Sequence, residues 1–589
     1  MTTLSQLRAI LRTHALDFYY VPATDPHQNE YVPGSYQRRT FITGFTGSAG
    51  DALIGLEFAG LWTDGRYFLQ AARELNPAEF TLMRQGEAPT LEAWLKEHGH
   101  PGMRIGVDSR VLSLTQAERF LDALKPHQGV LVATPENLID GLWTDRPPLP
   151  TGTVWEHPLT YAGLHAAEKI QQLRLHLAQH HAAAIAINRL DHIAWLFNIR
   201  SNSIPYQPTV LSQALITATQ AIWYIDTPYL DDTLRHYCEV QHIEIAPYDT
   251  LCNDLTHCKG TVWLDPIETT WAIAEAVPSE RRLLQTSPIT LKKAVKNEAE
   301  KRGMQDAHVQ DGIAMVRFLH WLETKRPSLL TEIDAATQLE QFRRDNALCV
   351  DLSFPTISGF GEHGAIIHYS ATAETNAVIK TDALYLLDSG GQYVNGTTDV
   401  TRTIHLGAPT AEEKRFYTRV LQGHIALGNY HFPHGTAGEH LDALARLPLW
   451  QEHCDYNHGT GHGVGAFLYV HEGPQSISKR PSQVPLLPGM MVSNEPGVYI
   501  PGRFGIRIEN VCVVEAIEDT TSATGHGPFY QLIDLTVVPY ARNLMDCSLL
   551  SRQEIAWINA YHAHVYNTLQ PYLTGPVLHW LEQATQALS

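Results

Sequence analysis

The spacing of apolar residues predicts an α/β domain at the start of the chain. Residues 16–23 and 51–64 are apolar runs of strand length, and the second contains a hairpin turn. Residues 67–75 place their apolar side chains at helical spacing. The stretch 145–152 is rich in proline and glycine, which favours a boundary between domains. We therefore expect the first domain to cover residues 1–150.

The same pattern returns further along the chain. Helical spacing over 167–182 leads into an apolar run at 182–187, and residues 214–227 resemble the segment 162 positions earlier. Two copies at so long a period indicate duplicated domains and not a solenoid. We expect a second α/β domain over 151–290, related to the first.

A long helix is predicted at the start of the remaining chain, over residues 291–327, with Pro327 ending it. Its core-facing positions recur every three or four residues: Met304, His308, Asp311, Met315, Phe318 and Leu322. Residues 350–515 then alternate strand-like runs with glycine turns and histidines, and 551–573 is again helical. We expect residues 291–589 to form one larger domain, with the final helix packed back on it.

Composition narrows the class of protein. Apolar residues make up 44% and charged residues 18%, as in folded globular proteins. The formal charge of −19 argues against non-specific binding to nucleic acid or anionic membranes, which needs basic patches. Seven scattered cysteines fit a reducing compartment, and no apolar run approaches a membrane span. Residues 1–16 are interpreted as a surface helix and not a targeting signal, so we expect a cytoplasmic protein.

Two aspartates stand at the ends of neighbouring apolar runs. Asp388 follows Tyr385–Leu387, a Gly390-Gly391 turn comes next, and Asp399 opens a second strand eleven residues after Asp388. Antiparallel pairing of the two strands would bring both carboxylates to one point. Either aspartate alone is more typical of a turn.

A glycine-rich stretch at 457–473 contains His458, His462 and His471. Glycine lets the backbone approach a ligand or metal closely, although a loop with surface histidines has the same composition. His368 ends another apolar run within 359–370 and by itself is more typical of a core histidine.

Two glutamates occupy strand positions near the end of this region. Glu495 follows the predicted strand 490–493, and Glu509 lies inside the predicted strand 507–514, with Arg507 on the same face. A buried carboxylate needs a metal or a cationic partner, because burying it alone costs several kcal/mol. The alternative is a surface ion pair between Arg507 and Glu509.

Two Asp, one His and two Glu in this order provide what a dinuclear divalent-metal site needs. Four carboxylates offset two dications, and some of them can bridge. Hard oxygen ligands favour Mn²⁺, with Co²⁺, Fe²⁺ or Zn²⁺ as substitutes, and the absence of thiolate ligands argues against structural zinc.

The segments LLDSGGQY, GTTDVTRT, HGTGHGVG, VHEGP, SNEPG and GIRIEN resemble the pita-bread metallopeptidases, and among them the long form of the aminopeptidase P family. The resemblance implies an α/β (α+β) chain. Two related creatinase-like α/β domains at 1–150 and 151–290 would precede a pita-bread catalytic domain at 291–589 with a C-terminal extension.

The resemblance also implies roles for individual residues. The implied metal ligands are Asp388, Asp399, His462, Glu495 and Glu509, of which Asp399 and Glu509 would bridge the two ions. His368, His458 and His471 match active-site histidines that are not ligands, and Arg507 matches an active-site arginine. Two departures stand out. Segment 199–208 lacks the Gly-Ser-Asp that the family has after the arginine, which leaves Arg200 without an assigned role, and Ser370-Ala371 replaces a family proline.

The implied reaction is removal of the first residue from peptides with proline at the second position. A hydroxide bridging the two metals would attack the first carbonyl, Glu495 would carry the proton to the prolyl nitrogen, and His471 would stabilise the oxyanion. The resemblance further implies a homodimer with no nucleic-acid or membrane partner.

Other readings of the same residues remain open. An Xaa-Pro dipeptidase shares the fold, and a non-catalytic pita-bread module that binds peptides or proteins is a different class. A methionine aminopeptidase fits less well because of the long N-terminal part. Creatinase-like chemistry fits less well because it does not use this metal set.

Overall fold

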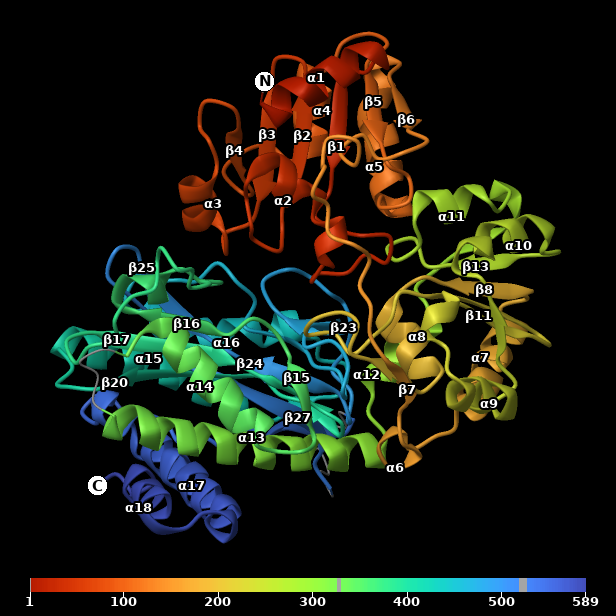
Figure 1. Cartoon of the computed structure of the whole chain (residues 1–589). Coiled ribbons are helices and arrows are strands. Elements are labelled where there is room, and N and C mark those ends of the chain that lie inside the picture. The colour runs from red at the N-terminus through yellow and green to blue at the C-terminus, as the bar shows by residue number, and fades with distance from the viewer. Residues whose placement is uncertain (1, 326–329, 519–526) are drawn as a thin grey trace. The chain divides into compact units, whose positions relative to one another are not determined.

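The computed structural model describes residues 2–325, 330–518 and 527–589. The chain divides into two compact units. Unit 1 contains residues 1–159 and 164–290, and unit 2 contains residues 160–163 and 291–589 (Figure 1). Pro327, expected to end a helix, lies outside the described residues.

Unit 1 contains two mixed sheets with the same strand order. The first runs β4-β3-β2-β1-β5-β6 and the second β12-β11-β10-β8-β13-β14. The strands of the first are β1 (Phe18–Val21), β2 (Asp51–Gly55), β3 (Ala59–Thr63), β4 (Thr81–Arg84), β5 (Arg104–Val107) and β6 (Val130–Ala133). Those of the second are β8 (Ala184–Ile187), β10 (Gln213–Thr217), β11 (Ala221–Tyr224), β12 (Glu244–Ala246), β13 (Val262–Leu264) and β14 (Arg282–Leu284).

The two sheets also share their pairing directions. In each, the first strand pairs antiparallel with the next strand of a hairpin and parallel with the strand on its other side. The hairpins β2–β3 and β10–β11 are both antiparallel and start 162 residues apart. The predicted repeat therefore extends to topology. We propose that unit 1 comprises two domains, residues 1–150 and 151–290.

Helices cover both faces of the first sheet. Tyr19 and Val21 pack into one apolar cluster with the buried leucines of α1, while Tyr20 packs into another with residues of α4 and α5. Successive strand residues point to opposite faces, so each face has its own core. The helices of unit 1 are α1 (Thr3–Thr13), α2 (Arg38–Thr43), α3 (Phe68–Glu74), α4 (Leu91–His98), α5 (Leu114–Leu124), α7 (Ala166–Gln179), α8 (Leu190–Leu196), α9 (Asp232–Val240), α10 (Leu251–His257) and α11 (Trp271–Glu275).

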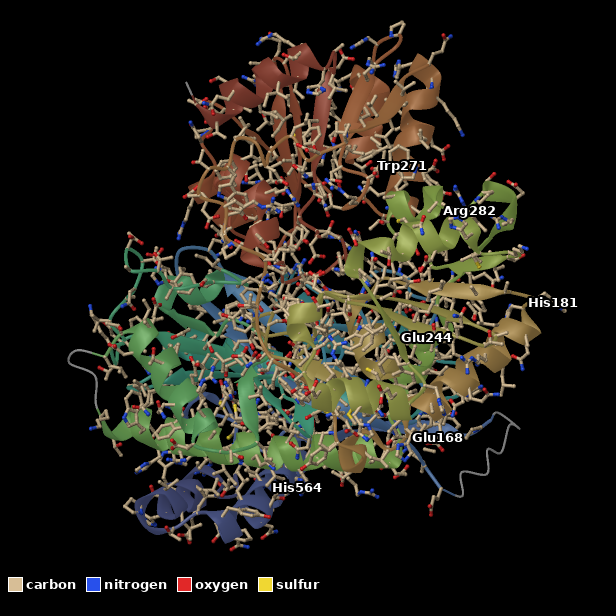
Figure 2. All side chains as sticks on the ribbon, turned by 45° about the vertical axis from the view of Figure 1, so that its right-hand side comes forward. Glu168, His181, Glu244, Trp271, Arg282 and His564 are labelled. Atoms are coloured by element: carbon tan, nitrogen blue, oxygen red, sulfur yellow. The ribbon has the colours of Figure 1, made fainter. Side chains whose placement is uncertain are left out.

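Charged groups lie on the outside of the second sheet and its helices. Figure 2 shows Glu168, His181 and Glu244 there, and all three are exposed. A short antiparallel pair, β7 (Val154–Glu156) with β9 (Ile199–Ser201), joins the start of this part to the segment after α8.

The long helix predicted over 291–327 is two helices. α12 (Pro288–Ala294) ends before Asn297, whose side chain accepts hydrogen bonds from the backbone N–H groups of Ala299 and Glu300 and so caps α13 (Glu298–Thr324). Asparagine at this position favours a helix start, because its side chain replaces missing backbone acceptors. The predicted core-facing positions of α13 are all buried: Met304, His308, Asp311, Met315, Phe318 and Leu322.

The strands of unit 2 form several small sheets and one larger one. The larger sheet runs β21-β28-β27-β24-β22-β23, and β16-β17-β20, β15-β18-β19 and β25-β26 form the others. The strands are β15 (Cys349–Leu352), β16 (Ile357–Phe360), β17 (Leu384–Ser389), β18 (Gly391–Tyr393), β19 (Gly396–Thr397), β20 (Val400–His405), β21 (Phe432–Pro433), β22 (Gly461–Gly463), β23 (Glu472–Ile477), β24 (Met491–Asn494), β25 (Gly497–Ile500), β26 (Phe504–Arg507), β27 (Asn510–Ala516) and β28 (Phe529–Asp534).

Helices pack around these sheets. α13 lies beside α14. The helices α17 and α18, blue in Figure 1, pack against α13, so the C-terminal helical segment packs back on the domain as expected from the sequence. The Trp580 indole N–H donates to Glu323 Oε2 at 2.7 Å across this contact. Besides α13, the helices of unit 2 include α14 (Glu332–Arg344), α15 (Ala411–Gly428), α16 (Asp442–Trp450), α17 (Arg552–Leu569) and α18 (Gly575–Ala584). No helix within the described residues is long and apolar enough to span a membrane.

Candidate metal centre

The first two aspartates come together through a pair of antiparallel strands, as predicted. β17 pairs with β20 so that Asp388 lies opposite Thr401 and Ser389 opposite Val400. Asp399 immediately precedes β20, so its backbone lies beside the end of β17 that carries Asp388. Both aspartates are buried, with exposures of 7% and 3%.

The histidines of the glycine-rich stretch lie on and around the hairpin β22–β23. His462 is in β22, and His471 immediately precedes β23. A Cβ at Gly461 would come within 2.0 Å of Ser493 O, so glycine lets β22 approach β24 closely. The Ser493 hydroxyl accepts the backbone N–H of His462 at 2.9 Å and thereby fixes its position.

The glutamates approach from the next two strands, with one correction to the prediction. Glu495 directly follows β24, as expected, but Glu509 lies between β26 and β27 and not within one strand. The strand breaks because its pairing partner changes: β26 pairs with β25, whereas β27 pairs with β24 and β28. At the break, the Glu509 N–H donates to Thr401 O at 3.2 Å, which brings Glu509 beside the strand that follows Asp399.

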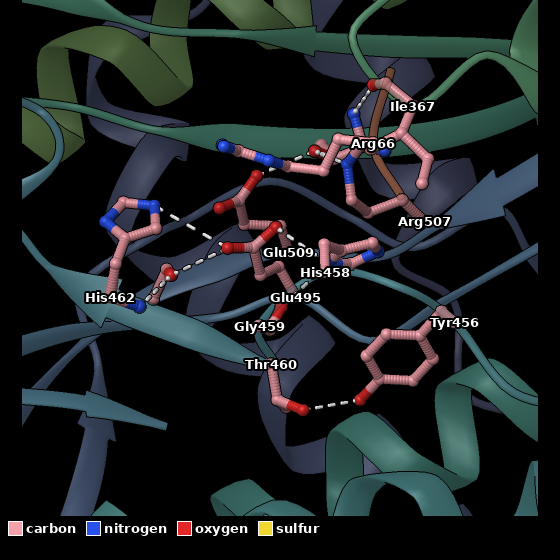
Figure 3. A network of polar contacts seen from close by, with 12 residues as sticks. Arg66, Ile367, Tyr456, His458, Gly459, Thr460, His462, Glu495, Arg507 and Glu509 are labelled. Carbon is pink, nitrogen blue, oxygen red and sulfur yellow. Dashed lines mark hydrogen bonds and ion pairs between the residues drawn. The ribbon is translucent and has the colours of Figure 1, made fainter. Parts of the chain in front are cut away.

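The side chains of His462, Glu495 and Glu509 point into one shared space (Figure 3). His462 Nε2 lies 3.4 Å from Asp399 Oδ2 and 3.6 Å from Glu495 Oε1. Asp399, His462 and Glu509 each offer a ligand atom, and these atoms lie within 4.8 Å of one another. Arg507 connects Asp388 to this group. Its Nη2 donates to Asp388 Oδ2 at 2.6 Å, and its Nε donates to the Thr401 hydroxyl, which in turn donates to Glu509.

Arg507 pairs with Asp388 instead of Glu509. Arg507 and Glu509 are 2% and 1% exposed, so the alternative of a surface ion pair is wrong. The Glu509 carboxylate instead accepts the Thr401 hydroxyl at 2.7 Å.

Burial and repulsion between like charges raise the pKa values of three carboxyl groups at the site. Burial is the main cause for Asp388, Glu495 and Glu509, and the charge of Asp399 adds to it in each. Burial alone would lower the pKa of His462, but its hydrogen bond to Asp399 and the charge of Glu495 raise it to about 9. The site thus holds more negative charge than its own cations balance.

The donor set fits a pair of divalent cations. Asp388 Oδ1 is buried and has no hydrogen-bond partner within the described residues, whereas Oδ2 is held by Arg507. An unpaired buried carboxylate oxygen is costly unless a cation binds it. Four carboxylates and one imidazole, without a thiolate, are ligands for hard or borderline divalent ions.

A second layer of polar contacts orients the histidines, and sequence reasoning missed most of it. The Tyr499 hydroxyl lies 2.8 Å from His458 Nε2 and accepts from Arg507 Nη1 at 2.6 Å. His458 Nδ1 lies 2.7 Å from the carbonyl of Gly459, which can only accept, so Nδ1 carries the proton. The one available signal for Tyr499 was its place just after SNEPG, in the strand following Glu495.

The predicted histidines His471, His458 and His368 flank this centre. The His471 ring packs edge-on against that of His462, with centroids 4.4 Å apart. His458 Nδ1 is 3.7 Å from Glu495 Oε2. His368 is partly exposed and follows Ile367, whose carbonyl accepts from Arg507 Nη2 at 3.4 Å. Arg200, which had no assigned role, lies in unit 1 and donates to the carbonyls of Ala194 and Ile199.

Arg402, another residue that the sequence did not single out, holds the backbone behind the centre. Its Nη1 donates to Glu509 O at 2.6 Å and to Thr401 O at 2.8 Å. Its Nη2 donates to Val538 O at 2.7 Å and contacts the Tyr561 hydroxyl at 3.1 Å. Arg402 therefore joins the segments next to Asp399 and Glu509 to helix α17.

Sequence profiles of known families match the chain from end to end. Residues 4–140 and 145–300 each match the creatinase/prolidase N-terminal domain, 302–516 match metallopeptidase family M24, and 528–588 match the C-terminal region of peptidase M24. Aminopeptidase P1 of Lotus japonicus is 40% identical over 99% of both chains. The chain belongs to the aminopeptidase P family.

Further relatives agree with this membership. A probable Xaa-Pro aminopeptidase P of Laccaria bicolor is 42% identical over 99% of this chain and 93% of its own length. The crystal structure of X-prolyl aminopeptidase from Caenorhabditis elegans, described as a cytosolic enzyme with a di-nuclear active site, superposes with a TM-score of 0.96. It shares 35% identity over 100% of this chain and 99% of its own. The fold of aminopeptidase P, with two creatinase N-terminal domains before a pita-bread domain, is thus the fold of this chain.

Proposed function

We propose that this protein is a metal-dependent aminopeptidase that hydrolyses the bond between the first residue of a peptide and a proline at the second position. One observation carries the proposal. Three buried carboxylates (Asp388, Asp399 and Glu509), the half-buried Glu495 and the His462 imidazole converge in a chain that matches aminopeptidase P relatives over its whole length. An Xaa-Pro dipeptidase would have the same centre, and the two differ in the length of peptide they accept.

The proposed ligands of two divalent cations are Asp388, Asp399, His462, Glu495 and Glu509. Asp399 and Glu509 would be the ligands shared by the two cations, and each offers a ligand atom within 4.8 Å of one of His462. Mn²⁺ is the proposed metal, because oxygen donors dominate the set. When bound, the pair of cations lowers the pKa of a water molecule and polarises the scissile carbonyl.

The chain's own residues would orient the substrate and move the protons. Glu495 is the proposed proton carrier to the prolyl nitrogen, because its Oε2 faces His458 Nδ1 at 3.7 Å. Tyr499 fixes the ring of His458 from its other side. With a proton on Nδ1, His458 can share this N–H between Gly459 O and Glu495.

His471 is proposed to donate to the oxygen on which negative charge develops, because it packs against His462 at the edge of the centre. His368 is proposed to shape the pocket. Arg507 holds Asp388 Oδ2 and balances one carboxylate, which leaves Oδ1 to bind a cation.

The preference for proline follows from the chemistry of the bond. An Xaa-Pro bond is a tertiary amide without an N–H, so peptidases that hydrogen-bond this group cannot position it. We propose peptides with proline at the second position as substrates, and a homodimer as the oligomeric state. We also propose a cytoplasmic location, as described for the Caenorhabditis elegans relative. For the oligomeric state the proposal follows the family resemblance. Light scattering of the purified protein tests the last point.

The test is an assay of the purified protein with Mn²⁺ on Arg-Pro-Pro peptides and on Xaa-Pro dipeptides. Release of the first residue from the longer peptide is expected, and turnover of dipeptides alone would show a dipeptidase instead. Asp399→Asn should abolish turnover, a loss of about a thousandfold or more. The bridging role is wrong if that variant keeps wild-type kcat. Elemental analysis showing no bound or bindable metal would favour a non-catalytic binding module.

A further inference from the structure

Three charged side chains outside the donor set are buried together in unit 2. Lys293 Nζ lies 2.5 Å from Glu472 Oε2, and Lys296 Nζ contacts Glu472 Oε1. Lys296 Nζ also donates to Lys293 O at 3.0 Å. The side-chain exposures of Lys293, Lys296 and Glu472 are 2%, 1% and 0%. The negative charge of nearby Glu300 also acts on Lys296.

Glu472 lies on the β22–β23 hairpin, which also carries His462 and His471. It is the first residue of β23 and directly follows His471. It also pairs with Gly463, the residue after His462, and the register shifts at that point. Neighbouring residues of an extended chain point to opposite sides, so the Glu472 carboxylate enters the interior while His471 faces the centre.

The two lysines belong to a segment that is tied to a different strand. Val295 forms a bridge with Met490, and the Lys296 N–H donates to Gly489 O at 3.0 Å. Gly489 and Met490 lead directly into β24, which ends at Asn494, immediately before Glu495. The Lys293–Glu472–Lys296 cluster therefore links the hairpin of His462 and His471 to the strand that carries Glu495.

A contribution to stability alone does not account for such a cluster. Charges are expensive to bury, and apolar side chains of similar volume often stabilise a protein as well or better. What an apolar replacement cannot supply is two directed bonds that hold one carboxylate, and with it the hairpin, in a single position.

We propose that Lys293, Lys296 and Glu472 are positioning residues that fix the β22–β23 hairpin, and thereby set His462 and His471 against Glu495. This inference rests on the proposed function for its kinetic readout. It also predicts that Mn²⁺ affinity falls when the cluster is removed, and this affinity can be measured whether or not the protein is an aminopeptidase.

The decisive variant replaces the cluster with apolar side chains: Lys293→Met, Lys296→Met and Glu472→Met combined. We expect its melting temperature to remain near that of the wild type. We also expect kcat to fall about 10- to 100-fold with KM little changed, and Mn²⁺ affinity to fall by a similar factor, as for other groups that orient metal ligands. Wild-type kcat and Mn²⁺ affinity in a folded triple variant would overturn the inference.

Single variants keep the test informative if the triple variant does not fold. Lys296→Met leaves a one-to-one pair of Lys293 with Glu472, so kcat and Mn²⁺ affinity should fall less than in Glu472→Gln, which leaves two buried lysines without their shared carboxylate. Equal, wild-type values in both would also overturn the inference. If no aminopeptidase activity is found in the wild type, the Mn²⁺ titrations alone decide.

Lys169→Met is the matched control. Lys169 is equally buried, bonded to Asn198 Oδ1 at 2.7 Å, and lies in unit 1, where no proposed metal ligand lies. We expect it to lower the melting temperature and to leave kcat and Mn²⁺ affinity unchanged.

Discussion

Replacing Tyr499 with phenylalanine removes one oxygen atom from the centre and keeps the ring. The hydroxyl accepts from Arg507 Nη1 at 2.6 Å and, with Nδ1 of His458 protonated, donates to Nε2 at 2.8 Å. The variant therefore breaks a chain of bonds from Arg507 through Tyr499 to His458. The bond from Arg507 to Asp388 uses the other terminal nitrogen and remains.

The size of the effect follows from the kinds of bond that are lost. A hydrogen bond to a charged donor contributes about 1.5–3 kcal/mol, and the bond to the neutral imidazole about 1 kcal/mol. Of this hydrogen-bond energy, only the share that orients His458 against Glu495 affects the reaction rate. We take that part as about 1–2 kcal/mol, which corresponds to a fall in kcat of about 5- to 30-fold.

The assay is steady-state hydrolysis of an Arg-Pro-Pro peptide with saturating Mn²⁺. We expect kcat to fall in Tyr499→Phe, and KM and Mn²⁺ affinity to stay near wild type, because the hydroxyl contacts none of the proposed ligands. Tyr417→Phe is the control. Its buried hydroxyl accepts the Ala541 N–H at 3.0 Å and takes no part in the contacts of Tyr499. A kcat within twofold of wild type in Tyr499→Phe would refute the proposed orientation of His458.

Three other results are expected. Burial lowers the pKa of His562 to about 3, below its unfolded value near 6.5. As the pH falls below about 6.5, the unfolded state therefore binds a proton that the folded state does not, and the free energy of unfolding should fall by up to about 1.4 kcal/mol per pH unit. Denaturant titrations of His562→Gln should show a shallower fall with pH, and an unchanged slope would exclude this group as the cause. Chelation should lower the melting temperature and added Mn²⁺ should restore it, because binding at a hundredfold excess over Kd adds about 2.7 kcal/mol to the free energy of unfolding. Calorimetry showing no shift would argue against the metal centre. Arg402→Lys cannot reach all the acceptors of the guanidinium, so Mn²⁺ affinity should fall about 10- to 100-fold, and isothermal titration giving the wild-type affinity would contradict its role in placing Glu509.

The sequence predicted the parts of the structure whose cause is local. Apolar runs separated by turn residues gave the hairpin β2–β3 and its repeat β10–β11, because side-chain alternation and glycine turns act over a few residues. Asp388 and Asp399 were predictable for the same reason, since a short connection joins their strands. The break in the helix before Asn297 was missed, although asparagine followed by Glu300 is a helix-start pattern.

The parts that the sequence could not predict depend on partners far along the chain. Tyr499 contacts His458 across 41 residues, Arg402 contacts Tyr561 across 159, and Lys293 contacts Glu472 across 179. No periodicity links such pairs, because each forms only when separate strands and helices pack together. The same reasoning explains Glu509. Its flanking residues have strand character, yet the chain changes pairing partner there, and that change frees the carboxylate to face Asp399. The proposed ligands could therefore be picked out from their own segments of sequence, whereas the strand break at Glu509 and the side chains that orient the ligands became visible only in the packed structure.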